Sequence, residues 1–334
     1  MKIGNSMQLL SKIRRHRVIL SAQISLTNRC NERCIHCLIC KHPAQELNTV
    51  QVKDMLSQLK ELNCMELTFT GGELMLRRDI FEILERAREN GFSIGVFSNG
   101  TLINEKAARA LKKAAVSDVQ ISLYGATAAT HDAITRLPGS FRRTKNALRA
   151  LKEQKIRFHV ATIVMRRNRH EVLSLKAWAK KSGIDIVFDV IIRPRNDGNM
   201  EILKNRLHDS EIGIMDRLRP GYLMRPKSAV KYFNKSQLCI HNLGRYNIYI
   251  SHDGTVFPHI DVMISLGNIK NEGLRDIWFY SKQAEYIRNL RFEDFRCSTC
   301  KEYRRCAWNP GLALQEHGSL FERPQELCRF VLKS

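Results

Sequence analysis

VILSAQISLTNRCNERCIHCLICKHP, residues 18–43, is the stretch that decides the fold. Its first nine residues, 18–26, form an apolar run of the length expected for a buried strand. Four cysteines then follow within eleven residues, namely Cys30, Cys34, Cys37 and Cys40. Because the loops that follow parallel strands build the active sites of barrel folds, we expect this cysteine-rich loop at the carboxyl end of a first barrel strand.

Strand and helix patterns alternate from this stretch to about residue 195. Five further apolar runs bounded by Gly, Asn or Asp are typical of strands, at residues 65–72, 92–100, 118–125, 157–165 and 184–192. Segments with helical periodicity lie near residues 50–62, 78–90, 104–115, 140–154 and 168–182. Such alternation predicts parallel strands with helical crossovers, and continuous apolar strands fit a sheet covered on its faces. We therefore predict an α/β fold, a partial (β/α)6 TIM-like barrel.

The pattern weakens after this region. Residues 194–235 predict a polar, Pro-punctuated connection with one short helix, and YNIYISHDGTVFPH, residues 246–259, alternates around an Asp-Gly turn as a hairpin does. A helix near 274–290 and a Cys-rich end follow. We divide the chain into a basic segment (1–17), a barrel core (18–195), a linker (196–235) and a small α+β domain (236–334).

Composition limits the compartment and the class of protein. No apolar run approaches the roughly eighteen residues that cross a bilayer, and the basic start has no long apolar core or small-residue cleavage site. We expect a cytoplasmic protein with no membrane partner. In that compartment the ten cysteines indicate metal binding or catalysis rather than disulfides.

The net charge of +22 is unevenly distributed. Residues 1–30 carry six Lys or Arg and no acidic residue, and residues 142–195 carry fifteen against four. One interpretation is a solvated basic surface. The other is attraction of an anionic partner, such as an acidic peptide, a tetrapyrrole polycarboxylate or a nucleic acid.

The cysteine loop suits an iron–sulfur cluster, because such clusters are held by Cys and usually take four ligands. Three closely spaced thiolates would leave one iron open. A zinc site could use Cys34, Cys37 and Cys40, although its usual signature is two separated CxxC pairs.

The spacing Cys30-x3-Cys34-x2-Cys37, with His36 before the last Cys, resembles the cluster loop of radical S-adenosylmethionine enzymes, and TGGE at 70–73 resembles their second motif. The resemblance covers about residues 18–195. It implies that S-adenosylmethionine is cleaved reductively to a 5′-deoxyadenosyl radical, which abstracts hydrogen from a substrate. It also implies an external electron donor such as flavodoxin or ferredoxin.

The resemblance assigns roles to individual residues. It implies that Cys30, Cys34 and Cys37 hold a 4Fe-4S cluster, and that Cys40 is a bystander because a fourth ligand would close the open iron. The turn Gly71-Gly72-Glu73 would receive the amino group of the cofactor methionine, which a carboxylate can bind. Further contacts to S-adenosylmethionine are expected from His36, Ser98, Asn99, Ser122 and Arg143.

A second set of thiols lies near the end of the chain, at Cys297, Cys300, Cys306 and Cys328. Four thiolates can saturate a cluster or a zinc ion, and this spacing resembles part of the SPASM domain, which carries auxiliary iron–sulfur clusters. Three positions that are cysteine in a full SPASM domain are occupied here by Cys239, His259 and Pro310. The resemblance therefore implies two 4Fe-4S clusters in all, with the first auxiliary cluster missing.

Cys239 and His259 are thereby left without a cluster to bind. They are a buried thiol and a hydrogen-bonded histidine, or else catalytic groups that donate hydrogen or act as acid or base, together with Asp261. Sulfatase maturation is disfavoured, because the Asp that directly follows the auxiliary-cluster cysteine in those maturases is replaced by Ile260 here.

The leading hypothesis is a radical enzyme that modifies a ribosomal peptide or protein. A tetrapyrrole-modifying enzyme of the haem d1 or alternative haem type is the alternative, because tetrapyrrole carboxylates would suit a basic surface. A non-catalytic iron–sulfur electron-transfer protein would not need the GGE and SNG motifs. A zinc-stabilised RNA-binding protein would need aromatic side chains among the basic residues, and none interleave there.

Overall fold

The computed structural model describes residues 12, 16–39, 45–214, 218, 243–304, 306 and 308–332. Two residues singled out in the sequence, Cys40 and Cys239, lie outside this part of the chain.

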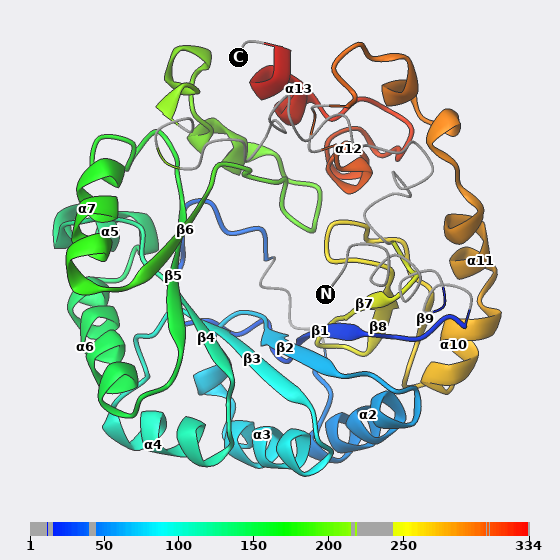
Figure 1. Cartoon of the computed structure of the whole chain (residues 1–334), viewed down its shortest axis with the longest axis horizontal. Coiled ribbons are helices and arrows are strands. Elements are labelled where there is room, and N and C mark those ends of the chain that lie inside the picture. Colours follow the sequence, from blue (N-terminus) through cyan, green and yellow to red (C-terminus); the bar gives the residue numbers. More distant parts are fainter. Residues whose placement is uncertain are drawn as a thin grey trace.

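Six parallel strands form most of one sheet, whose order is β6-β5-β4-β3-β2-β1-β7-β8-β9. They are β1 (Ser21–Ser25), β2 (Glu66–Thr70), β3 (Ser93–Ser98), β4 (Asp118–Ser122), β5 (Phe158–Ile163) and β6 (Asp185–Asp189). Each lies inside its predicted range, because each apolar run is ended by turn residues. Figure 1 shows the sheet curving into an open barrel with helices outside it, so the predicted fold class is confirmed.

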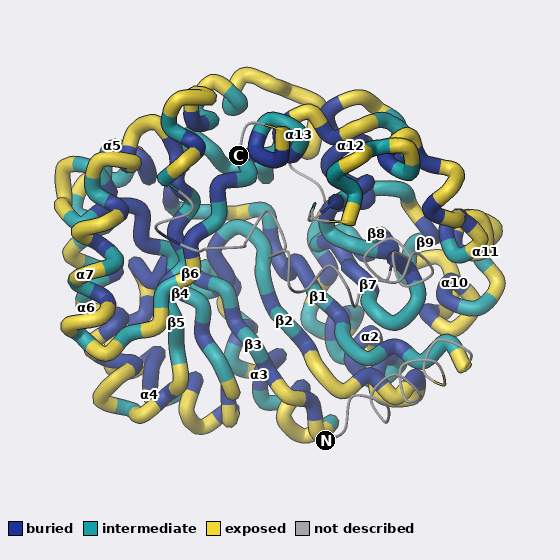
Figure 2. The backbone as a smooth tube through the Cα atoms, turned by 45° about the horizontal axis from the view of Figure 1, so that its top comes forward, coloured by how far each residue is buried: buried dark blue, intermediate teal, exposed yellow. Residues whose placement is uncertain are grey.

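Five helices occupy predicted segments: α2 (Thr49–Glu61), α3 (Ile80–Glu89), α4 (Glu105–Lys113), α6 (Ser140–Glu153) and α7 (Val172–Ser182). In α2 the buried residues Val52, Met55, Leu56 and Leu59 recur at helical spacing, which turns one apolar face toward the sheet. Figure 2 shows that exposed residues gather on the outer sides of α4 to α7, which face away from the sheet. An additional helix, α5 (Ala128–Thr135), was not predicted.

The predicted hairpin is present and joins the same sheet. Strand β7 (Asn247–Ile250) pairs in parallel with β1, with Ser21 opposite Asn247, and β8 (Thr255–Phe257) runs antiparallel to β7. A short strand, β9 (Gly267–Asn268), completes the edge. The hairpin therefore extends the barrel sheet, although the predicted linker separates the two in the sequence. The hairpin turn lies beside the carboxyl end of β1.

The remaining elements lie after the hairpin. The helix predicted near 274–290 is two helices, α10 (Leu274–Tyr280) and α11 (Lys282–Asn289), because the backbone of Ser281 is extended. Short 3-10 turns cover Phe292–Asp294 and Arg296–Thr299. The chain then forms α12 (Pro310–His317) and α13 (Gln325–Leu332).

Helices α12 and α13 pack against the segment that follows β6, which contains the 3-10 turns η2 (Glu201–Asn205) and η3 (Asp209–Glu211), as Figure 1 shows. The buried guanidinium of Arg206 lies 2.7 Å from a Glu316 carboxylate oxygen and 3.4 Å from one of Glu326. These ion pairs join α12 and α13 to the segment that follows the last barrel strand. Within the described ranges, no helix is both long and apolar enough to cross a membrane.

Candidate active site

The cysteine loop after β1 is held against the turn after β2 by backbone hydrogen bonds. The Gly72 N–H donates to Thr27 O at 2.7 Å, and the Glu73 N–H donates to Arg29 O at 2.8 Å. A Cβ on Gly72 would lie 2.1 Å from Arg29 O. Gly71 adopts a φ of +135°, and a Cβ there would lie 2.4 Å from Thr27 O, so both positions require glycine.

Cys30, Cys34 and Cys37 are half-buried on this loop and form no disulfide with the described residues. Burial raises the pKa of the Cys34 thiol well above its usual range, and the charges of Glu32, Cys37 and Cys30 act in the same direction. Bound iron would reverse the effect, because a metal deprotonates a coordinating thiol.

The described part of the chain contains no group of three His, Cys, Asp or Glu side chains that converge on a single ion. Thiolates on one zinc ion share a centre at about 2.3 Å, whereas thiolates on a cluster bind separate irons.

Glu73 connects the glycine turn to the end of β3. Its carboxylate is fully buried and accepts hydrogen bonds from Ser98 Oγ at 2.9 and 3.0 Å, from the Asn99 N–H at 2.8 Å and from the Met75 N–H at 3.1 Å. Burial raises the pKa of Glu73, and these donors oppose the rise. Its carboxylate thus positions the Ser98-Asn99 turn, and binding of an ammonium by Glu73 stays a prediction.

Asn99 extends this connection to the cysteine loop. Its Nδ2 donates to Asn31 Oδ1 at 2.9 Å and lies 3.9 Å from Cys30 Sγ, while its Oδ1 accepts from the Thr101 hydroxyl at 2.7 Å. The predicted residues at 71–73, 98 and 99 therefore form one continuous network with Cys30.

His36 lies on the cysteine loop itself, whereas Ser122 and Arg143 lie on β4 and α6. The His36 ring packs edge-on against Tyr124, with centroids 4.6 Å apart, and burial lowers the pKa of His36 to about 4. Ser122 ends β4 and interacts with the Tyr124 phenol. Arg143 lies on α6, and its charge acts on Glu32, whose pKa burial raises to about 7. Tyr124 and Glu32 were not predicted as parts of this site, because no motif in the sequence singles them out.

A cavity of about 470 Å³ lies at the carboxyl ends of the strands, and we call it the strand-end cavity. Its lining includes Ser25, Thr70, Gly71, Ile163, Arg193 and Tyr249. His36, Cys37, Leu38 and Ile39 of the cysteine loop form one wall. This is where a bound cofactor and a substrate could meet the open side of a cluster.

Asp261 and His259 lie behind this cavity. The buried Asp261 carboxylate is 2.8 Å from Arg193 Nε, accepts from Asn309 Nδ2 at 2.7 Å and lies 3.6 Å from His259 Nδ1. Arg193 and the other partners outweigh burial and lower the pKa of Asp261. A carboxylate held in this way positions Arg193 at the cavity wall. Arg193, which the sequence analysis missed, could have been found as a basic residue just after the sixth strand.

The second cysteine set lines one cavity of about 860 Å³, the auxiliary cavity, which contains Cys297, Cys300, Cys306 and Cys328. Burial raises the pKa of Cys297 to about 12, and the neighbouring Cys328 and Cys300 add to the rise. Burial likewise raises the pKa of Cys328, and the charge of Arg323, which lines the same cavity, opposes the rise at both Cys297 and Cys328. Four thiols around one cavity with a nearby cation fit an anionic cluster.

Comparisons with known proteins agree with this geometry. The sequence model of the Radical SAM superfamily matches residues 24–179, and that of the SPASM iron-sulfur cluster-binding domain matches residues 239–306. The mycofactocin maturase MftC of Mycobacterium tuberculosis is 33% identical over 303 residues, covering 84% of this chain and 75% of the relative. An AdoMet-dependent heme synthase of Methanosarcina barkeri is 29% identical over 313 residues, covering 84% and 88%.

Among solved structures, Streptococcus suis SuiB bound to its precursor peptide SuiA has the same fold. Its TM-score is 0.72 at 14% identity, over 97% of this chain and 80% of SuiB.

Proposed function

Because the chain belongs to the radical S-adenosylmethionine superfamily and carries a SPASM domain, it is an enzyme, and we propose that it modifies a ribosomal peptide or protein. Members of this family use S-adenosylmethionine and iron–sulfur clusters. We propose further that it holds two 4Fe-4S clusters, that the residues predicted from the sequence bind these clusters and S-adenosylmethionine, and that it is cytoplasmic.

In this proposal Cys30, Cys34 and Cys37 hold the catalytic cluster. When bound, that cluster supplies one electron to S-adenosylmethionine, which yields methionine and a 5′-deoxyadenosyl radical. The glycine turn at 71–73 approaches the cofactor through its backbone, because added side chains would clash with the loop. Glu73 fixes Ser98 and Asn99 for contact with the cofactor.

The strand-end cavity supports a peptide substrate. Pockets for one drug-sized ligand measure about 300–1,000 Å³, and S-adenosylmethionine is itself such a ligand. A cavity of about 470 Å³ therefore has the size to take an amino-acid side chain of a substrate near the cofactor. SuiB, which has the same fold, binds a precursor peptide. Cavity size is the single observation that carries the peptide hypothesis.

Tetrapyrrole modification is the second candidate, because an AdoMet-dependent heme synthase is similar over most of this chain. Its carboxylated substrate would need several cations at the reaction site. The charged side chains that line the strand-end cavity are instead largely paired, Arg193 with Asp261 at 2.8 Å and Asp197 with Arg195 of the neighbouring cavity at 2.7 Å.

The test is anaerobic reconstitution with iron and sulfide, followed by dithionite and S-adenosylmethionine, with mass spectrometry of 5′-deoxyadenosine. Peptides encoded by neighbouring genes and a panel of carboxylated tetrapyrroles are then added separately. We expect a mass change in a peptide. A mass change in a tetrapyrrole alone would establish the second candidate instead.

The matched variants are Cys30→Ala/Cys34→Ala/Cys37→Ala, which should form no 5′-deoxyadenosine, and Cys64→Ala, which should behave as wild type. Cys64 is a buried thiol that belongs to neither cysteine set. Undiminished cleavage in the triple variant would contradict the assignment of the cluster.

A further inference from the structure

The cysteine loop separates two cavities. One is the strand-end cavity, and the other, of about 910 Å³, lies against the loop from a different side and is called the basic cavity. Cys37 and Ile39 line both cavities, and Cys34 lines the basic cavity. A molecule bound in the basic cavity therefore contacts the loop that holds the cluster without occupying the strand ends.

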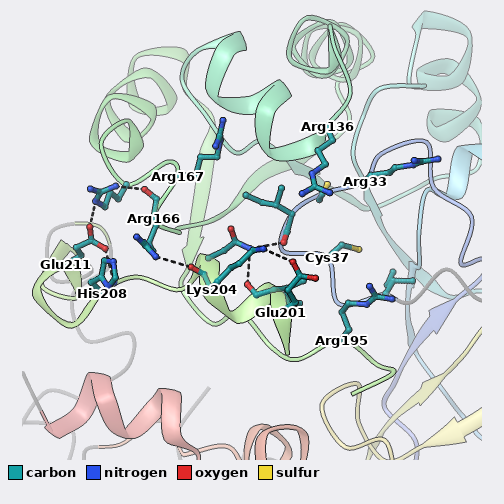
Figure 3. A pocket seen from close by; sticks show the side chains of 16 residues that line it. Arg33, Cys37, Arg136, Arg166, Arg167, Arg195, Glu201, Lys204, His208 and Glu211 are labelled. Carbon is teal, nitrogen blue, oxygen red and sulfur yellow. Dashed lines mark hydrogen bonds and ion pairs between the residues drawn. The ribbon is translucent and has the colours of Figure 1, made fainter. Parts of the chain in front are cut away.

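The basic cavity carries a large excess of positive charge. Seven Lys or Arg line it against two Glu, and Figure 3 shows how these side chains surround it. Both acids are already neutralised, since Glu201 lies 2.6 Å from Lys204 and Glu211 pairs with Arg169. Four exposed arginines form no ion pair within the described residues, namely Arg33, Arg136, Arg166 and Arg167.

The rim of the basic cavity is fixed to the cysteine loop by backbone bonds. The Arg33 N–H donates to Thr135 O at 2.9 Å, and the Ile35 N–H donates to Ile134 O at 3.0 Å. On the other side, Asn205 Nδ2 donates to Ile35 O at 2.9 Å. A partner that binds the arginines is thus held at a defined position relative to Cys34 and Cys37.

The location of the charge favours an electron donor over a substrate. A substrate must reach the strand-end cavity, where the charged side chains are largely paired. The proposed reaction also needs one electron for each S-adenosylmethionine cleaved, and that electron has to arrive at the cluster from outside. Unpaired arginines beside two cluster cysteines would attract an acidic protein by complementary charge.

We propose that the basic cavity is the docking site of an acidic one-electron carrier protein that reduces the cluster held by Cys30, Cys34 and Cys37. This inference rests on the proposed function. The donor loses one electron, which is consumed when the bond between C5′ and the sulfonium sulfur breaks. The sulfur keeps an electron pair as the thioether of methionine, and C5′ keeps the unpaired electron.

The test uses a purified flavodoxin and the double variant Arg136→Glu/Arg167→Glu, which leaves the cysteine loop unchanged. The matched control is Lys106→Glu/Arg149→Glu, which makes the same change in charge at exposed positions on α4 and α6. The first measurement is the Kd of oxidised flavodoxin for each full-length protein at low and moderate salt. The second is the rate of 5′-deoxyadenosine formation with flavodoxin or with dithionite as reductant.

We expect the cavity variant to bind flavodoxin at least about tenfold more weakly at low salt, with a shallower salt dependence, while the control changes less than about twofold. With dithionite all three proteins should cleave S-adenosylmethionine equally. An unchanged Kd in the cavity variant, or no binding of flavodoxin by the wild type, would overturn the proposal.

A different result would also overturn it: flavodoxin affinity is retained while affinity for the modified substrate is lost, which would make the cavity a substrate site. Failure of the proposed function is distinguishable, because wild-type protein reduced by dithionite would then leave every peptide unmodified. The Kd comparison does not depend on that activity.

Discussion

Replacing Gly72 by alanine should separate the cysteine loop from the glycine turn. The new Cβ would lie 2.1 Å from Arg29 O, whereas ordinary contact begins at 3.4 Å. The loop backbone must therefore retreat by about 1.3 Å, since backbone atoms cannot rotate away as a flexible side chain can. That movement lengthens the 2.8 Å bond from the Glu73 N–H to Arg29 O beyond hydrogen-bonding distance.

The magnitude follows from two costs. Overpacking a closely fitted position costs about 1–3 kcal/mol. A buried backbone donor left unbonded costs about 1–3 kcal/mol more. The backbone conformation adds nothing, because Gly72 does not lie in the left-handed region. We therefore expect a loss of about 2–6 kcal/mol in unfolding free energy, and a misplacement of about 1 Å should slow cleavage of S-adenosylmethionine about 100-fold.

The assay is anaerobic urea unfolding, combined with the rate of 5′-deoxyadenosine formation under dithionite. Gly213→Ala is the matched control, because Gly213 has no neighbouring atom within 4 Å of an added Cβ and no left-handed φ. Its stability should change by less than about 1 kcal/mol. If Gly72→Ala unfolds like Gly213→Ala and keeps the wild-type rate, the contact between turn and loop does not position the site.

Three further outcomes are expected. Cys328→Ser should lower the iron content from about eight to about four per chain, each cubane holding four, while cleavage under dithionite continues; eight irons in this variant would refute its role. Burial lowers the pKa of His131 to about 4, so its contribution to stability is full above pH 6.5 and falls by about 3 kcal/mol as the pH drops toward 4; in the same unfolding series the decline of His131→Asn should be smaller by that amount. Arg206→Met leaves the buried Glu316 carboxylate without its cation and should cost about 3–5 kcal/mol in urea unfolding, against no measurable loss for the exposed Arg149→Met.

The barrel strands could be predicted because their signal is local. Each is an apolar run that turn residues end, and such a run has few alternatives as a buried parallel strand. Helix α5 was missed because AATHDAIT has a weak amphipathic pattern. It is fixed by contacts that follow from the fold, since Asp132 accepts from the Gly139 N–H at 2.6 Å and from the Phe141 N–H at 2.8 Å.

The position of the hairpin could not be predicted in the same way. The sequence indicated β7 and β8, but the pairing of Ser21 with Asn247 joins residues that are far apart in the chain. Nothing in either strand specifies the other as a partner. The sequence likewise placed both cysteine sets, while the convergence of the second on one cavity required the packing of α13.

The position of the basic cavity also could not be predicted from the distribution of charge along the sequence. The sequence revealed an excess between residues 142 and 195, but Arg33 and Arg136 lie outside that range and contribute to the same cavity. They meet the arginines at 166 and 167 because the cysteine loop is bonded to the end of α5. A count of charges along the chain could therefore indicate an anionic partner without locating it.

The attachment of the cysteine loop explains why its two sides can be tested separately. It is bonded to the turn after β2 through Gly72 and Glu73, to the end of β3 through Asn99, to α5 through Ile134, and to η2 through Asn205. Replacing exposed rim arginines by glutamate reverses their charge without breaking these bonds, because the bonds to α5 use backbone atoms. Donor affinity should therefore respond to charge at the rim, whereas binding of S-adenosylmethionine should respond to the fit between the glycine turn and the loop.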